Sequence, residues 1–211
     1  MSTELIKGQD LELAPPASTT EDVIRVAEVI GRAFNDLPMF IYMGASTNAG
    51  KTEEQVTEHF GRMVAGYKHH GAILLHSYDH AAVAVWLPPG QFRIPPVESE
   101  IPAAGYDIAS SFYNIGVKHG FHTRKHWHLQ LIARDPARQG EQNTHAISSI
   151  VRPILKRAVD IDKVPVVLEC AGTKKAMAVY EHWGFKTLDY APVKKGEIPI
   201  AYMTFNYIKN E

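Results

Sequence analysis

Apolar residues recur along the chain with two different periods, and these periods predict helices and strands. Between residues 20 and 34 the apolar positions lie three or four apart and follow the polar start Ser18-Thr19-Thr20, which is typical of a helix. From residue 127 to 134 apolar and polar residues alternate, which is the period of a strand. Further helices are predicted over residues 52–70, 105–120, 146–159 and 174–183, and further strands over 72–77, 81–87, 164–170, 185–190 and 200–207.

The order of these elements predicts the fold class. After residue 126 they follow as strand, helix, strand, helix, strand, strand, which indicates a mixed sheet with helices packed on it. A chain of 211 residues fits one large domain, so we expect a single α/β domain over residues 1–211. Its N-terminal half would cover residues 10–125 and its C-terminal half residues 126–211.

Residues 88–105 are rich in proline and lack periodicity, so we expect a long loop there. Long loops in compact domains often bind or cover ligands. The alternative is an exposed crossing without a function.

The composition of the chain argues against nucleic-acid binding, a membrane segment and an intrachain disulfide. The chain is 45% hydrophobic and 21% charged with a formal net charge of −1, so no overall field would attract nucleic acid. No apolar run approaches the roughly 20 residues that span a bilayer, so we expect no membrane segment. The single cysteine, Cys170, excludes an intrachain disulfide and is expected to be a packed core thiol. A cytoplasmic protein, monomeric or homodimeric, is the simplest expectation.

Two stretches of the second half resemble a known family. "WHLQLIARDPARQG", followed by a helix and then by "VVLECAGTKKAMAVYEHWGFKTLD", is similar to the GNAT superfamily of acetyl-CoA-dependent N-acetyltransferases. The phrases "AVAVWLPPG" and "HWHLQLIARDP" resemble a microbial and fungal subset that acts on small molecules. The resemblance implies the GNAT fold, a mostly antiparallel sheet with helices on both faces. It also implies that the sheet is splayed open by a bulge on the strand at 127–134.

The resemblance also implies where acetyl-CoA would bind. Its pantetheine would pair with the backbone of the bulged strand, and its pyrophosphate would lie at the start of the following helix, where unpaired N–H groups favour an anion. The implied cofactor-binding residues are Leu131, Ile132, Ala133, Gln139, Gly140, Glu141, Gln142, Asn143, Thr144 and Thr173.

The pyrophosphate turn departs from the family pattern. Gln139 fits the pattern, but Gln142 and Thr144 stand where glycine would let phosphate approach the backbone. Glu141 places a negative charge beside the expected anion. Their side chains can turn outward while the backbone N–H groups still face a phosphate. The alternative is a well-capped helix without a ligand.

Candidate acid and base residues follow from the needs of acyl transfer to an amine. By resemblance Tyr180 would protonate the leaving thiolate, although a tyrosine packed on the sheet fits the same spacing. Gln130 occupies the position of the family's glutamate base and cannot accept a proton, so we choose His128, two residues away, as the base. A histidine merely satisfied at the sheet surface is the alternative. Further candidates for the base are Asp107, Glu98 and Glu100.

The acceptor side is expected along the proline-rich loop and the helix that follows it. The residues that we assign to the substrate pocket are Gln130, Trp86, Tyr106 and Asp107. His126 and His128 would project from one strand face, but no supporting carboxylate or thiol lies at suitable spacing, so we expect no metal there.

Three functions stay open at this point. The first is transfer of an acetyl group from acetyl-CoA to an amine of a small molecule. The second keeps the fold without the cofactor and performs acid/base chemistry on a metabolite. The third is a non-catalytic binding module on the same scaffold.

Overall fold

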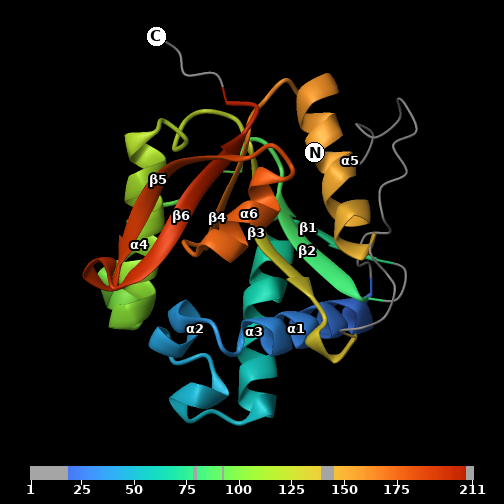
Figure 1. Cartoon of the computed structure of the whole chain (residues 1–211). Helices are drawn as coiled ribbons and strands as arrows, with labels where there is room; N and C mark the ends of the chain where they lie inside the picture. Colours follow the sequence, from blue (N-terminus) through green and yellow to red (C-terminus); the bar gives the residue numbers. More distant parts are fainter. Residues whose placement is uncertain (1–18, 78–79, 92, 139–144, 208–211) are drawn as a thin grey trace.

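The computed structural model describes residues 19–77, 80–91, 93–138 and 145–207. One six-stranded sheet, with strand order β1-β2-β3-β4-β6-β5, runs through it (Figure 1). All neighbouring strands are antiparallel except β3 and β4. The strands are β1 (Ile73–His76), β2 (Ala82–Leu87), β3 (Trp127–Arg134), β4 (Val166–Ala171), β5 (Lys186–Val193) and β6 (Ile198–Phe205).

Helices cover both faces of the sheet. The α-helices are α1 (Thr20–Phe34), α2 (Pro38–Tyr42), α3 (Glu53–His69), α4 (Ala103–Lys118), α5 (Ala146–Asp160) and α6 (Lys174–Glu181). Each predicted helix and strand is confirmed with its bounds shifted by a few residues. The short helix α2 was not predicted. Among the described residues, no helix has both the length and the hydropathy of a membrane-spanning segment.

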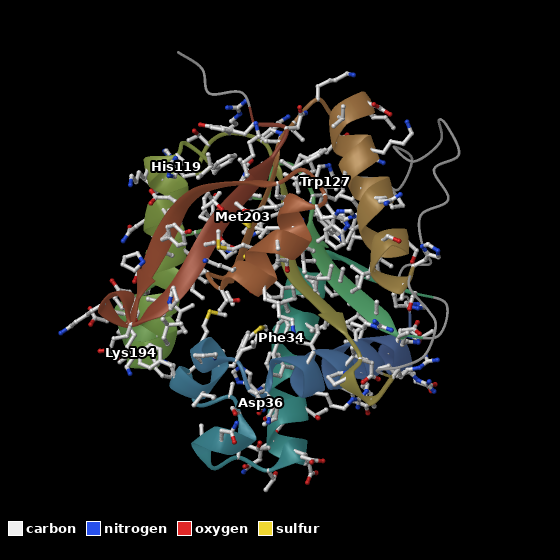
Figure 2. All side chains as sticks on the ribbon, viewed as in Figure 1. Phe34, Asp36, His119, Trp127, Lys194 and Met203 are labelled. Carbon is white, nitrogen blue, oxygen red and sulfur yellow. The ribbon has the colours of Figure 1, made fainter. Side chains whose placement is uncertain are left out.

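Three apolar clusters hold these layers together, and each belongs to a different set of helices. The first lies between α5 and one face of β2, β3, β4 and β6, and contains Trp127 and Met203 (Figure 2). The second lies on the other face, between α1, α3 and the strands β1 to β3. The third lies on that same other face, between α4 and the strands β4 to β6. The border between the second and third clusters therefore follows β3 and β4.

The β3 strand carries a bulge where its two neighbours change. On β2, Val85 pairs with Leu131 and the next residue, Trp86, pairs with Leu129, so Gln130 is an extra residue on β3. Strict alternation predicts that Leu131 shares a face with Leu129, and this expectation is wrong. Leu129 packs in the cluster under α5, whereas Leu131 packs in the cluster with α1 and α3.

The sheet opens directly after this bulge. β3 and β4 pair in parallel only from Trp127–Val166 to Leu129–Leu168. Beyond that point β4 remains paired with β6 up to Ala171, and β3 remains paired with β2 up to Arg134. The split implied by the family resemblance is therefore present, between residues 130–134 of β3 and residues 169–171 of β4.

Candidate active site

A buried polar cluster lies at the mouth of the split, on the border between the second and third apolar clusters. It joins His128 of β3, Glu169 of β4 and Arg93 of the loop after β2. The two terminal nitrogens of the Arg93 guanidinium, Nη1 and Nη2, donate to the Glu169 carboxylate at 2.7 and 2.9 Å. His128 Nε2 lies 2.8 Å from Glu169 Oε2 and 3.1 Å from Arg93 Nη2. The side chains of His128 and Glu169 are 4% and 5% exposed, so this network is shielded from water.

Hydrogen-bond chemistry assigns the proton on His128. Glu169 can only accept, so Nε2 of His128 carries the hydrogen and donates it to the carboxylate. The free hydrogen of Arg93 Nη2 then goes to Gln130 Oε1, 3.3 Å away. This assignment leaves Nδ1 of His128 with its lone pair, which is the atom that can accept a proton.

The surroundings keep His128 neutral and Glu169 charged. Burial lowers the pKa of His128, and the neighbouring Arg93 lowers it further, while Glu169 opposes both. Burial disfavours the Glu169 carboxylate, but Arg93 and His128 outweigh it and hold its pKa at about 2. A neutral imidazole oriented by a fixed carboxylate is the arrangement that a general base needs.

Residues from both sides of the border hold Arg93 in place. Its guanidinium lies 5.1 Å from the ring centroid of Phe112 on α4, a cation–π contact. On the other side, Gln130 also contacts the hydroxyl of Tyr67 on α3. Arg93 thus connects α4 to the half of the molecule that carries α3.

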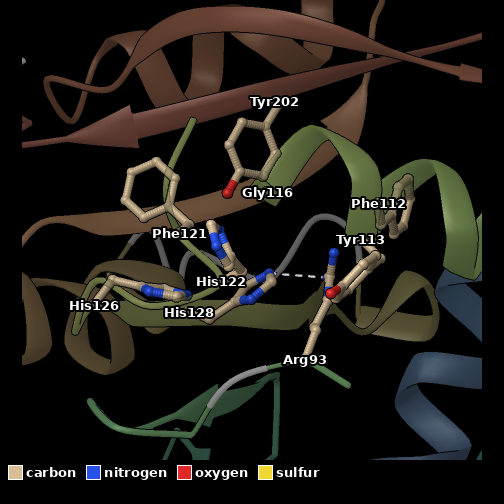
Figure 3. Close-up of a pocket in the computed structure, with 9 residues that line it drawn as sticks. All are labelled: Arg93, Phe112, Tyr113, Gly116, Phe121, His122, His126, His128 and Tyr202. Carbon is tan, nitrogen blue, oxygen red and sulfur yellow. Dashed lines mark hydrogen bonds between the residues drawn. The ribbon is translucent and has the colours of Figure 1, made fainter. Parts of the chain in front are cut away.

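A small, partly open pocket borders this network (Figure 3). It encloses about 290 Å³, counting its open mouth. Burial, together with the neighbouring His128, lowers the pKa of His126 to about 4, so this pocket histidine is neutral. The walls are mostly aromatic, and the lining residues are Arg93, Phe112, Tyr113, Gly116, Phe121, His122, His126, His128 and Tyr202.

Tyr180 lies on the opposite face of the sheet from the pocket. It is half-buried on α6, packs against the cluster under α5, and makes edge contacts with Trp183 and Phe185. Burial raises the pKa of its phenol well above the ordinary value, so the hydroxyl keeps its proton. The nearby Cys170 is buried, and burial raises the pKa of its thiol to about 12. The thiol therefore stays protonated, as expected for an unreactive residue of the core.

The described residues of the predicted cofactor site are distributed along the split. Leu131 and Ala133 point to the side of α1 and α3, and Ile132 points to the side of α5. Thr173 caps α6, because its hydroxyl accepts from the backbone of Ala176. Residues 139–144, predicted to contact the pyrophosphate, lie outside the described residues.

Three residues that we assigned to the substrate pocket do not line the pocket beside His128. Trp86 is fully buried in the cluster under α5, because its position opposite Leu129 turns it to that face. Asp107 accepts from the backbone of Lys194 at 2.7 Å, away from the His128 network. Tyr106 is its neighbour at the start of α4, and the pocket is lined by later turns of that helix. Gln130 does reach the network, through Arg93.

Two residues of this network were missed by the sequence analysis. Glu169 interrupts the apolar strand sequence "VVLECA", and a lone carboxylate inside such a strand is a sign of a buried partner. Arg93 lies in the proline-rich loop, and nothing in the local pattern distinguishes it from a solvated arginine.

Comparison with known proteins finds a family model that matches part of the chain and several solved structures with a similar fold. Residues 18–92 match the family described as the YOR012W acetyl transferase domain. A histone acetyltransferase HPA2 and related acetyltransferase from Corynebacterium glutamicum has a similar structure, with a TM-score of 0.61 and 18% identity over 92% of this chain and 98% of that one. Arylalkylamine N-acetyltransferase 2 of Aedes aegypti matches with a TM-score of 0.60 and 15% identity, over 92% and 97%.

The chain has the GNAT fold. A further relative of this fold is the C-terminal condensation domain of Ebony, solved in complex with beta-alanyl-dopamine. Its TM-score is 0.58 at 10% identity, over 90% of this chain and 96% of that domain. No curated protein matches the sequence. Within the GNAT fold, the split between β3 and β4 and the network at its mouth are the features that bear on function.

Proposed function

We propose that the protein transfers an acetyl group from acetyl-CoA to the amine of a small molecule. The observation that carries the proposal is the position of His128, a neutral buried imidazole at the point where β3 leaves β4. In the part of the chain that the structure describes, the edge of β3 from Leu131 to Ala133 has no strand partner on the β4 side. Its backbone groups fit the amide-bearing arm of acetyl-CoA, which supplies the activated acetyl group when bound.

The residues around the split divide the work of acyl transfer. Nδ1 of His128 accepts the proton that the amine loses as it attacks the thioester carbonyl, and Glu169 holds the ring in the tautomer that this requires. Backbone N–H groups near Ile132 stabilise the tetrahedral oxyanion. The phenol of Tyr180, on the other side of the sheet, donates a proton to the departing thiolate and regains one from solvent, while His128 releases the proton that it took from the amine.

The pocket next to His128 favours an acceptor with an aromatic or other flat apolar part. Its walls include Phe112, Tyr113, Phe121 and Tyr202, which offer ring faces and edges. The one permanently charged lining residue, Arg93, is neutralised by Glu169. Two proteins of similar fold support an aromatic acceptor. One is an arylalkylamine N-acetyltransferase, and the Ebony domain was solved in complex with beta-alanyl-dopamine.

A binding experiment tests the proposal before any acceptor is known. Acetyl-CoA should stabilise the native protein by RT ln(1 + [L]/Kd), about 2.7 kcal/mol at a concentration of 100 Kd. Calorimetric titration should give one site per chain. Release of free thiol should then be measured with arylalkylamines and with aliphatic polyamines, and we expect faster turnover with the former.

Absence of both heat and stabilisation with millimolar acetyl-CoA would refute the transferase. Turnover of a metabolite that needs His128 but no acetyl-CoA would instead support acid/base chemistry without the cosubstrate.

A further inference from the structure

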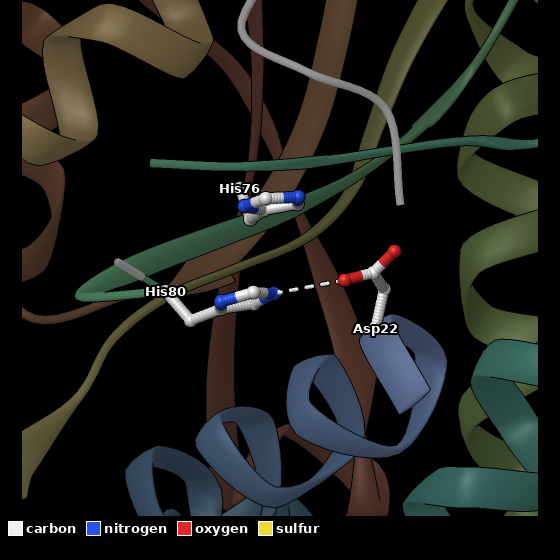
Figure 4. Close-up of side chains that lie close together, drawn as sticks. All are labelled: Asp22, His76 and His80. Atoms are coloured by element: carbon white, nitrogen blue, oxygen red, sulfur yellow. Dashed lines mark ion pairs between the residues drawn. The ribbon is translucent and has the colours of Figure 1, made fainter. Parts of the chain in front are cut away.

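Three potential metal ligands meet far along the sheet from the His128 network, at the other end of the β1–β2 hairpin (Figure 4). Asp22 lies in the first turn of α1, His76 is the last residue of β1, and His80 precedes β2. One donor atom from each residue lies within 4.8 Å of the others. The cluster therefore joins the hairpin to the start of a helix that is about 50 residues away in the sequence.

The two imidazoles are stacked with one nitrogen of each ring turned toward the Asp22 carboxylate (Figure 4). Their ring centroids are 3.9 Å apart and the planes differ by 6°. His80 Nε2 lies 3.6 Å from Asp22 Oδ1, which is too long for a hydrogen bond. It is close to the separation of about 3.3 Å that two donors have when both bind one tetrahedral zinc ion at about 2.05 Å.

Contacts outside the cluster orient two of the three donors. Nδ1 of His76 lies 2.9 Å from the carbonyl oxygen of Ser77, so it carries the hydrogen and leaves the lone pair on Nε2. Asp22 Oδ2 accepts from the backbone of Thr19 at 3.0 Å, which fixes the carboxylate with Oδ1 toward His80. A histidine whose second nitrogen donates to a carbonyl is the usual outer support of a metal ligand.

We propose that Asp22, His76 and His80 form a binding site for a zinc-class divalent cation, with water as the fourth ligand. Two neutral imidazoles and one carboxylate are a donor set that zinc prefers over calcium or magnesium. Binding requires the stacked rings to tilt so that their lone pairs converge, which closes the donor separations from within 4.8 Å to about 3.3 Å. His76 is 8% exposed, and the side chains of His80 and Asp22 are 16% and 21% exposed, so the ion would be half-shielded at the surface.

The bound ion would act as a clip between α1 and the β1–β2 hairpin. Its effect is on stability, since the cluster lies apart from the pocket that borders His128. This site is independent of the transferase proposal, and either can fail without the other.

The test uses the full chain, stripped with a chelator and dialysed against zinc chloride. Elemental analysis should give close to one zinc per chain, and titration with zinc should raise the melting temperature. Cobalt should give the visible absorption of a tetrahedral site, and this absorption should vanish on addition of zinc.

Variants separate this site from binding at other histidines. His76→Ala and, independently, the more exposed His80→Ala should weaken zinc binding at least tenfold and abolish the zinc-dependent rise in melting temperature. The matched control is His69→Ala/His70→Ala, which removes an exposed histidine pair with ring centroids 5.2 Å apart at the end of α3. It should bind zinc as the parent does. Zinc that is retained in folded His80→Ala would overturn the proposal, as would loss of zinc from the control or less than a tenth of an equivalent in the parent.

Discussion

At the residue scale, the assignment of His128 as base rests on one hydrogen bond and on its burial. Nε2 donates to Glu169 at 2.8 Å, which leaves Nδ1 as the atom that would take the proton from the amine under our proposal. Replacing His128 by Gln keeps a polar group of similar size but removes the base, so we expect kcat/KM for acetyl transfer to fall by about 10² to 10⁴. The measurement is thiol release at saturating acetyl-CoA.

Two further readouts distinguish a base from a packing residue. His128→Gln should retain acetyl-CoA binding, and His122→Gln, which alters the same pocket wall, should retain most of the turnover. Because burial lowers the pKa of His128, the parent should keep its activity below pH 6.5, where an ordinary histidine becomes protonated. Equal losses in both variants would contradict the assignment.

Arg93 gives a second prediction at this scale, concerning stability. It donates two hydrogen bonds to a carboxylate that is only 5% exposed. Arg93→Met would leave Glu169 buried without its cation, and we expect the free energy of unfolding to fall by about 3–5 kcal/mol. Urea denaturation measures this loss.

The double variant tests the cause of that loss. Arg93→Met/Glu169→Gln removes the stranded charge as well, so it should recover a substantial part of the stability. If the double variant is less stable than Arg93→Met, the buried charge is not the reason for the loss.

At the element scale, local patterns are sufficient for most of the fold. The capping box of Thr19 and Asp22 starts α1, and helical spacing marks α3 and α5 within a few residues of their bounds. The bulge at Gln130 could not be read from the pattern, because one extra residue leaves the polar–apolar alternation of β3 unchanged. It reverses the face of the sheet to which each later side chain points, so alternation alone puts Leu131 on the wrong face.

The end of α6 gives a prediction at the same scale, because Gly184 closes the turn behind Tyr180. Gly184 has φ +88, and a Cβ added to it would lie 3.3 Å from the ring of Phe205. Gly184→Ala should lower the free energy of unfolding by more than the 1–2 kcal/mol that a left-handed alanine costs alone. Chemical denaturation measures the loss.

Gly50 is the matched control for this substitution. It has a similar φ of +83, and an added Cβ would meet nothing within 4 Å. Gly50→Ala should therefore show only the backbone cost. Equal losses at the two positions would mean that the contact with Phe205 contributes nothing.

At the scale of the whole molecule, the candidate site is built from residues that are far apart in the sequence. Arg93 contacts Glu169 across 76 positions and His128 across 35. His128 could be chosen from chemistry and spacing on a single strand. Its partners depend on how β4 lies beside β3 and on the path of the loop after β2, and no local pattern encodes either. For the same reason, the sequence could not show that Trp86 and Asp107 lie away from the pocket beside His128.

The buried ionisable groups of this site make the stability of the whole protein depend on pH. The pKa of His126 falls from 6.5 to about 4 on folding, because burial and the neighbouring His128 disfavour its charged form. The pKa of Glu169 falls from 4.5 to about 2, since Arg93 outweighs the effect of burial. Both groups bind fewer protons in the folded state than in the unfolded state, so acid must favour unfolding.

The expected pH curve has two parts. The contribution of His126 is complete above pH 6.5 and is lost between about pH 6.5 and 4, and it amounts to something on the order of 3 kcal/mol. That of Glu169 is lost over the next lower range, between about pH 4.5 and 2. Urea denaturation at a series of pH values measures both parts. His126→Gln should make the upper part shallower, with His128 still contributing there, and leave the lower part, whereas His69→Gln, at an exposed position, should leave the whole curve unchanged. A parent curve that is flat from pH 7 to 4 would mean that His126 is charged in the folded protein, and the neutral pocket that we describe around His128 would then be wrong.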